Sequence, residues 1–439
     1  MNGKQQYYGN IKKRSNEQRN DTLAKLYRES EYANESSLKP KKAKTASRSD
    51  IDDFLSDASD ISEEKLKEKR SAKKRRERNE KKAAAKASAA KVFKRITIVL
   101  VIIAIIGGGV FLFLKTGASS TELDALETAE AKPDEIYYSR LTGKEVANAE
   151  TTTAATTCIM IENSPSARPQ SGLNEAGVIY EAIAEGGITR FLAIFQEAKP
   201  SYVGPVRSVR LTFAELAKPY HCSIAHVGGS DNALNLIRNN SEFRDIDQFF
   251  NDKYYWRIRS RAAPHNVYTR FSMLDELNFN KGYRTSEFNG FARVKPDTTP
   301  IAPETVANTI NIPMGSATYS PTYTYNAETN KYLRSYAQGG EHYSISEDGT
   351  KIRNAPDVVV AMKVTSIARS SEASYADYVT TGTGDAYIFQ NGGVISGRWT
   401  RENVNSELRF TDTSGNDIQL NRGQTWITLY PSNNNVTWQ

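Results

Sequence analysis

The chain has three regions that differ in how apolar and polar residues alternate. The first ninety or so residues contain few branched aliphatic side chains and many Lys, Arg, Glu, Ser and Asn. One long apolar run follows, and past about residue 135 short apolar segments alternate with polar turns. A segment as polar as the first cannot bury enough apolar surface to offset chain entropy. We therefore predict a disordered tail over residues 1–94.

The apolar run "ITIVLVIIAIIGGGVFLFL" spans Ile96–Leu114 without a charged residue. A bilayer core requires about 20 apolar residues, so we expect a transmembrane helix over residues 95–115. Lys and Arg are dense before the run, whereas Glu122, Asp124, Glu127 and Glu130 follow it. Basic residues stay on the cytoplasmic side. The sequence thus predicts a single-pass protein of the cell membrane with a cytoplasmic amino terminus and extracytoplasmic carboxyl-terminal domains.

The formal charge of +7 comes mostly from the tail. This placement gives a topological reason for the basic pI, and we do not expect a nucleic-acid partner. The basic run from Lys65 to Arg95 is compatible with a helix lying on anionic lipid or with a solvated segment that only sets the orientation. Upstream, "DIDDFLSDASDISEEK" resembles a docking motif for a cytosolic protein partner.

The external region has two patterns after a linker over residues 116–136. In residues 137–294, "TCIMIE", "RFLAIF" and "CSIAHV" have the character of strands, whereas "SVRLTFAELAK" and "GGSDNALNLI" have that of helices. After a linker over residues 295–315, residues 316–439 show strands joined by Gly- and Asn-containing turns, with a hairpin pattern around "NAETN". We therefore predict an α/β domain followed by a mostly β domain, both outside the membrane.

Cys158 and Cys222 are the two cysteines of the chain. They are compatible with a disulfide in an oxidising exterior and equally with two buried thiols. Neither has the spacing of a zinc site, and we expect no metal and no cofactor.

The stretch "YVGPVRSVR" places Arg207 and Arg210 directly after a Gly-Pro turn. At a helix start, a spacing of three puts both guanidiniums on one face, where they suit a phosphate or a carboxylate. The alternative is an internal ion pair with Glu181 or Glu185. We expect the arginines to meet an anion from outside.

A second candidate anion-binding turn is "HVGGSD", formed by Gly228, Gly229, Ser230 and Asp231 between a strand and a helix. Glycine also serves plain loop geometry at such positions. The stretch lacks the spacing of a phosphate-binding loop or a nucleophile elbow, so we do not expect Ser230 to be a nucleophile.

The candidate acid/base residues are two histidines and two glutamates. His226 and His265 both lie in motif-like stretches, and imidazole changes protonation near neutral pH. Glu181 and Glu185 are evenly spaced on a strand and are expected to share a face, with Arg190 beyond a Gly-Gly break.

The stretch "RAAPHNVY" adds Arg261, Asn266 and Tyr268, a hydrogen-bonding set suited to sugar hydroxyls or phosphate oxygens.

The external region resembles the YerB-like extracytoplasmic proteins, a family of unknown function. The resemblance rests on "LTG" at 141, "NSPSARPQSGLNEAGVIYEAIAEGGITRFLAIF" from 163, "VGPVRSVR", "HVGGSD", "APHNVYT" and "GRWTR…LRFTDTSGNDIQLNRGQTWI". It implies an envelope protein anchored outward and supplies no reaction. Members are often lipoproteins with an acylated cysteine, whereas this chain is expected to use a spanning helix.

Three hypotheses follow for the function. The first, which we favour, is a binding protein whose α/β domain recognises an anionic cell-wall polymer. The second is a glycan hydrolase or transferase that uses His226 or His265 beside an arginine-lined anion site. The third is a scaffold that links cytosolic partners to an external complex.

Overall fold

The computed structural model describes residues 135–298, 303–367 and 375–439. These residues belong to one compact unit, Glu130–Gln439. In this part of the chain no helix has the length and apolar character needed to cross a bilayer. The tail and the expected spanning helix over residues 95–115 lie outside the described residues.

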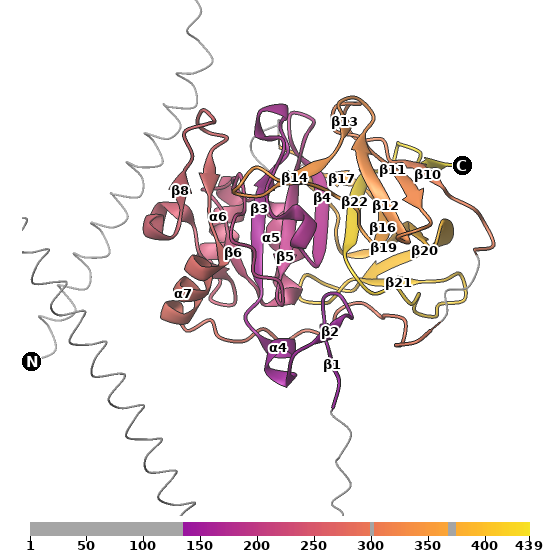
Figure 1. The fold of residues 1–439 in the computed structure, drawn as a ribbon, viewed down its shortest axis with the longest axis horizontal. Coiled ribbons are helices and arrows are strands. Elements are labelled where there is room, and N and C mark those ends of the chain that lie inside the picture. The colour runs from indigo at the N-terminus through magenta and orange to yellow at the C-terminus, as the bar shows by residue number, and fades with distance from the viewer. Residues whose placement is uncertain (1–134, 299–302, 368–374) are drawn as a thin grey trace, which may run out of the picture. The chain divides into compact units, whose positions relative to one another are not determined.

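The described residues are rich in β-structure, with a few helices (Figure 1). A mixed sheet of ten strands has the order β21-β20-β19-β16-β22-β4-β5-β3-β6-β7. Its strands are β3 (Thr157–Glu162), β4 (Val178–Glu185), β5 (Ile188–Phe195), β6 (Ser223–Ala225), β7 (Arg244–Asp245), β16 (Val358–Val364), β19 (Gly382–Gln390), β20 (Gly393–Arg401), β21 (Arg409–Thr411) and β22 (Thr425–Pro431).

Strand β22 joins the two halves of the external region. It pairs in parallel with β16 on one side and with β4 on the other, so the sheet continues across both halves (Figure 1). Its residues Thr425 to Tyr430 are all buried. A strand covered on both faces needs a continuous apolar run, and "WITLY" supplies one. Trp426 packs edge-on against Phe191 of β5, with 5.5 Å between the ring centroids.

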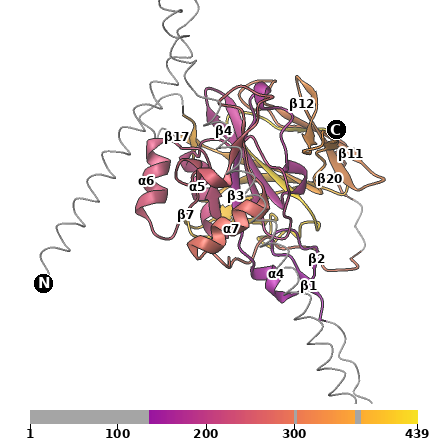
Figure 2. The same ribbon diagram turned by 60° about the vertical axis from the view of Figure 1, so that its left-hand side comes forward.

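Helices cover both faces of the amino-terminal half of the sheet (Figure 2). Helices α5 (Leu211–Ala217) and α6 (Asp231–Asn239) contribute Phe213 and Ala233 to the core on one face. Helix α7 (Phe271–Lys281) contributes Leu274 to the core on the other face. The short helix α4 (Ala149–Thr153) is capped by Asn148.

A second sheet packs against the carboxyl-terminal half. Its order is β13-β12-β11-β10-β23, and its Ile310 and Tyr323 pack with Val359 and Phe389 of the large sheet. The hairpin expected around "NAETN" is confirmed as β11 and β12. The strands are β10 (Thr309–Asn311), β11 (Pro321–Asn326), β12 (Lys331–Tyr336), β13 (Gly340–Glu341) and β23 (Thr437–Trp438).

Short two-stranded ladders complete the described structure. They are β1 (Tyr137–Tyr138) with β2 (Glu145–Val146), β8 (Trp256–Arg257) with β9 (Val267–Tyr268), β14 (Tyr343–Ile345) with β15 (Lys351–Arg353), and β17 (Ser366–Ile367) with β18 (Asp377–Tyr378).

Cys158 and Cys222 form a disulfide, with 5.7 Å between their Cα atoms. It links β3 to the residue just before β6, the strand that pairs in parallel with β3. The structure therefore selects the bonded alternative of the two that the sequence left open.

Candidate functional site

The site begins where β3 ends and the antiparallel β5 starts, on the face covered by α5. Glu162, the last residue of β3, lies opposite Arg190 of β5. Both side chains point to the same face as Met160 and Leu192, which belong to the core beneath α5. The apolar alternation of these strands thus ends in a buried carboxylate and a buried guanidinium.

Residues 203–210 form an extended segment beside this end of the sheet. The amide of Arg207 donates to Met160 O at 2.9 Å, and the amide of Val209 donates to Gly228 O at 3.0 Å. These bonds hold the segment extended, and α5 begins only at Leu211. The expectation that Arg207 and Arg210 share a helix face is therefore wrong. Gly204 is required here because a Cβ would lie 2.8 Å from the ring of Tyr268.

Glu185 is the carboxylate shared by Arg190 of β5 and Arg210 of the extended segment, so Arg210 forms the internal ion pair that the sequence offered as the alternative. It forms ion pairs with both Arg190 and Arg210. Arg190 also donates to Ser208 O at 2.7 Å, and the Arg210 guanidinium lies 4.5 Å from the centre of the Tyr375 ring.

Glu162 is the second carboxylate of the site. Its Oε1 lies 2.9 Å from His265 Nδ1 and accepts from Ser164 Oγ at 2.9 Å. Arg207 Nε lies 3.8 Å from the same oxygen. Glu162 Oε2 is buried and has no hydrogen-bond partner among the described residues.

We call Glu162, Glu185, Arg190, Arg207, Arg210 and His265 the open cluster. Among the described residues it brings three guanidiniums and two carboxylates together. The side chains of Glu185 and His265 are 22% and 26% exposed, so solvent reaches the cluster at these two residues.

Burial and the short distances between charged groups shift the pKa values in the open cluster. Burial opposes ionisation of Glu185, but Arg190 and Arg210 outweigh it and lower its pKa. Burial likewise opposes ionisation of Glu162, yet His265 and Arg207 lower its pKa. Burial, together with the nearby Arg210, lowers the pKa of Arg190 to about 9. Both acids therefore stay ionised at neutral pH, and the positive charges of the guanidiniums repel one another.

Glu181 does not belong to this cluster. It points to the opposite face of the sheet, where it pairs with Arg334 of β12 at 2.8 Å. The expected shared face with Glu185 is wrong because the β4–β5 register shifts between Ile183 and Glu185. Such a bulge turns the residues beyond it to the other face. The two glutamates therefore do not form an acid/base pair.

His226 lies in a separate buried group. Its Nε2 donates to Asp245 at 3.1 Å, its Nδ1 donates to Gly228 O at 2.8 Å, and Asp247 is 4.0 Å away. Burial disfavours the charged ring, but Asp247 and Asp245 outweigh burial and raise its pKa. Because His226 is fully buried, it has no access to a ligand in solvent.

The "HVGGSD" loop packs against the arginine-bearing segment. A Cβ on Gly229 would lie 2.7 Å from the Val209 side chain, and Gly228 has a φ of +60°. Ser230 precedes α6 and donates to Asn232 at 2.6 Å, while Asp231 is exposed. The loop thus uses its glycines for close packing, the alternative that the sequence had left open.

The stretch "RAAPHNVY" contributes one residue, His265, to the open cluster. Arg261 donates to the carbonyls of Ala167 and Pro169. Asn266 accepts from Arg257 at 2.8 Å. Tyr268 is buried and stacks on Tyr202, with 4.6 Å between the ring centroids. These last three residues are therefore engaged in the fold.

Sequence reasoning missed Glu162 and Ser164. The signal was present, because "IENS" follows the buried strand "TCIM" directly. Polar residues that end a buried strand are candidates for a site at the sheet edge. Among the described residues, no group of three His, Cys, Asp or Glu side chains is arranged to hold a metal ion.

Two segments of the chain match one family of proteins. Residues 141–284 match its N-terminal domain and residues 310–427 its C-terminal domain, both described as "Protein of unknown function (DUF3048)". The chain belongs to this family. The protein of Bacillus subtilis (strain 168) named "Putative lipoprotein YerB" is 30% identical over 281 residues, which are 62% of this chain and 80% of that protein.

The crystal structure of the YerB protein from Bacillus subtilis is similar to this chain, with a TM-score of 0.61. The two are 26% identical, and the match covers 69% of this chain and 99% of that one. The resemblance to YerB-like proteins that the sequence motifs indicated is thus confirmed.

Proposed function

We propose that this protein is an extracytoplasmic binding protein whose open cluster takes an anionic group of a cell-wall component. The observation that carries the proposal is the convergence of Arg190, Arg207 and Arg210 at a site that solvent reaches at Glu185 and His265. A phosphate or carboxylate beside Arg207 and His265 would relieve the crowding of positive charge.

Three further observations support an extracytoplasmic location for the described part of the chain. Disulfides such as Cys158–Cys222 persist in oxidising compartments. The Bacillus subtilis relative carries a name that describes a lipoprotein. The apolar run Ile96–Leu114 with its basic amino-terminal flank fits a single membrane anchor with the described part outside. A contact of the basic run with anionic lipid and a cytosolic partner for the tail remain predictions.

The test uses the purified full chain in detergent and a defined anionic probe, a glycerol phosphate oligomer, titrated by calorimetry. We expect saturable binding that weakens as salt rises, because the attraction is between charges. Arg207→Gln should lower the affinity about tenfold, the loss expected for one charge-assisted bond. Arg398→Gln, which removes an exposed arginine on β20, is the matched control.

The proposal would be contradicted if the folded wild-type chain showed no salt-dependent binding to the oligomer and none to a carboxylate-bearing wall fragment. Equal losses from Arg207→Gln and Arg398→Gln would also contradict it, because the effect would then be one of overall charge.

A second candidate function is hydrolysis or transfer on an envelope glycan. Glu162 orients His265 through Nδ1, which leaves Nε2 as the nitrogen available for acid/base work. Ser164 Oγ lies 3.3 Å from Nδ1, the nitrogen that faces Glu162, so an activated water is a better nucleophile than this serine. Release of soluble products from wall material, abolished by His265→Ala, would favour this function over binding alone.

A further inference from the structure

A hollow of about 790 Å³ lies beside β21, the edge strand of the large sheet. None of its lining residues belongs to the open cluster. Its walls come from residues 289–292, from the connection between β20 and β21, and from the polar strand residues Thr383 and Thr400. We propose that this hollow binds an uncharged N-acetylated glycan. This inference goes beyond the proposed function and does not depend on it.

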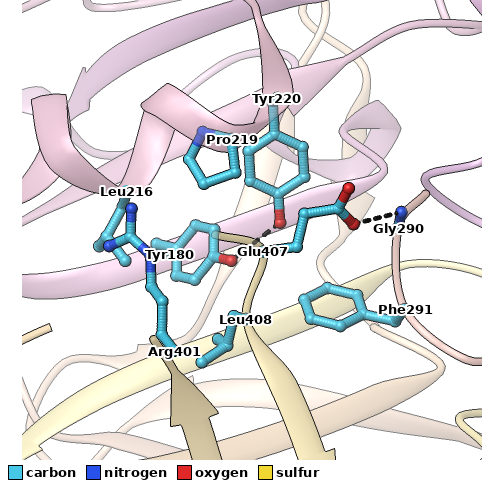
Figure 3. A pocket seen from close by; sticks show the side chains of 9 residues that line it. All are labelled: Tyr180, Leu216, Pro219, Tyr220, Gly290, Phe291, Arg401, Glu407 and Leu408. Carbon is cyan, nitrogen blue, oxygen red and sulfur yellow. Dashed lines mark hydrogen bonds between the residues drawn. The ribbon is translucent and has the colours of Figure 1, made fainter. Parts of the chain in front are cut away.

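One wall of the hollow is fixed by Glu407 (Figure 3). Its carboxylate accepts from the amides of Asn289 at 2.7 Å and Gly290 at 2.8 Å. Gly290 has a φ of +77°, and a Cβ there would lie 1.9 Å from Arg140 O. The wall is therefore held in place before any ligand arrives.

The hollow adjoins a small inner recess that shares Gly290, Phe291, Glu407 and Leu408 with it. The recess measures about 10 Å³, close to the space of one water molecule. The hydroxyls of Tyr180 and Tyr220, which also line the recess, bond to each other at 2.8 Å (Figure 3). A glycan therefore has room in the outer hollow alone.

The outer hollow combines an apolar floor with a polar rim. Phe291 stacks on Phe410 with 5.5 Å between the ring centroids, and Ile418 and Leu420 are buried beside them. The rim carries the uncharged hydrogen-bonding groups of Thr400, Asn405 and Ser406. It also carries two exposed carboxylates, Glu402 and Asp417. A sugar ring presents an apolar C–H face together with hydroxyl and amide groups, which is the complement of this arrangement.

The charges of the lining argue against an anionic ligand. Arg409 is the one cation among the described lining residues, and it donates twice to Asp417, at 3.1 Å and 2.8 Å. Glu402 and Glu407 add carboxylates without further cations. Carboxylates are strong acceptors for sugar hydroxyls, whereas they repel phosphate.

The backbone of the lining argues against an extended peptide. The amide of Leu420 already donates to Ala292 O at 2.9 Å, and the amide of Ile418 donates to Phe410 O at 2.9 Å. A peptide that adds to a sheet needs unpaired main-chain groups along an edge. Because these main-chain groups are already paired, the lining favours a glycan over an extended peptide.

The test titrates the full chain in detergent with chitotetraose, a defined N-acetylglucosamine oligomer, at two salt concentrations. We expect saturable binding that salt leaves unchanged. Thr400→Tyr fills the hollow from an exposed strand position and should lower the affinity at least about tenfold, while Glu402→Gln removes one acceptor and should lower it roughly two- to tenfold. Glu328→Gln, at an exposed acid in the β11–β12 turn, is the matched control and should bind as the wild type does.

Absence of saturable binding to the folded wild type would overturn the proposal, as would undiminished binding by Thr400→Tyr. Tighter binding of a tetra-alanine peptide than of chitotetraose would assign the hollow to peptide instead. If Thr400→Tyr fails to fold, the comparison of Glu402→Gln with Glu328→Gln decides. Arg207→Gln should leave chitotetraose binding unchanged, which separates this site from the open cluster.

Discussion

Glu181 and Glu185 lie four residues apart on β4 but bind arginine in two different settings. Glu181 and Arg334 are both fully buried, one carboxylate facing one guanidinium at 2.8 Å. Glu185 is partly exposed and faces two guanidiniums, those of Arg190 and Arg210. The bulge after Ile183 separates the two settings onto opposite faces of the sheet.

The group around Glu181, which we call the sealed cluster, is Asn163, Gln170, Glu181, Arg334, Tyr336 and His342. Its side chains hydrogen-bond mainly to one another. Arg334 donates to His342 Nδ1 at 2.6 Å, and His342 Nε2 donates to Gln170 Oε1 at 2.9 Å. Burial and the nearby Arg334 hold the pKa of His342 well below its usual value, so the ring is neutral.

The two settings separate arginines that stabilise the fold from arginines that suit a ligand. A buried one-to-one ion pair ties β12 of the second sheet to β4 of the first. The open cluster gathers three guanidiniums where solvent reaches Glu185 and His265, a setting that suits an anionic ligand. Single variants in the two clusters test this division.

Arg334→Met should destabilise the protein by roughly 3–5 kcal/mol, because it leaves the buried Glu181 carboxylate without its cation. Chemical denaturation of the full chain measures the free energy of unfolding. Arg398→Met, at an exposed position, should change it by less than about 0.5 kcal/mol.

The double change Glu181→Leu with Arg334→Met sharpens the same test. Removing both charges from a sealed site is often close to neutral, so the double variant should regain most of the lost stability. A double variant as unstable as the single one would show that the hydrogen-bond network, and not the ion pair, holds the halves together.

Loss of the disulfide should have the next largest effect. Cys158→Ala with Cys222→Ala removes a link across 64 residues and should cost roughly 2–4 kcal/mol. Urea midpoints with and without reductant provide the measurement, and reductant should leave the double variant unaffected. An identical midpoint for wild type and double variant would mean that β3, which carries Glu162, needs no such link.

Arg210→Met is the counterpart of Arg334→Met in the open cluster. Glu185 keeps Arg190 as a partner, so the stability cost should be only about 1 kcal/mol, while affinity for the glycerol phosphate oligomer should fall about tenfold. Denaturation and calorimetry on the same preparation measure both. Losses as large as those of Arg334→Met would show that the open cluster, too, is structural.

The sequence predicted individual elements better than the geometry between them. The strand "TCIMIE", the helix "DNALNLI" and the "NAETN" hairpin are confirmed as β3, the main part of α6 and the β11–β12 pair. Each depends on local alternation and turn residues, which a single segment encodes.

The rest depends on contacts that no single segment encodes. The bulge that separates Glu181 from Glu185 follows from pairing with β5, and the extended form of residues 203–210 follows from pairing with β3. The insertion of β22 between β16 and β4 brings together residues far apart in the chain. Sequence patterns therefore found most members of the open cluster but missed Glu162 and placed Glu181 on the wrong face.

The smallest predicted effect is a difference in how the stability contributions of two buried histidines, His226 and His342, depend on pH. Both have an ordinary pKa near 6.5 when unfolded. His226 faces Asp245 and Asp247, with Arg238 beyond them, and its pKa is raised in the fold despite burial. Its contribution to stability is complete below about pH 6.5 and is lost as the pH rises through the folded-state value. Asp245 stays ionised throughout, because His226 and Arg238 outweigh burial and lower its pKa to about 2.

His342 should show the opposite dependence, because its neutral form is the one that accepts from Arg334. Its pKa is lowered by burial and by the Arg334, Arg168 and Arg353 charges, so its contribution is complete above about pH 6.5 and is lost on acidification. Urea unfolding at several pH values should therefore show the stability loss of His226→Gln shrinking as the pH rises and that of His342→Gln shrinking as it falls. Parallel profiles for the two variants would mean that the sealed cluster tolerates a charged ring, and the contrast with the open cluster would then rest on exposure alone.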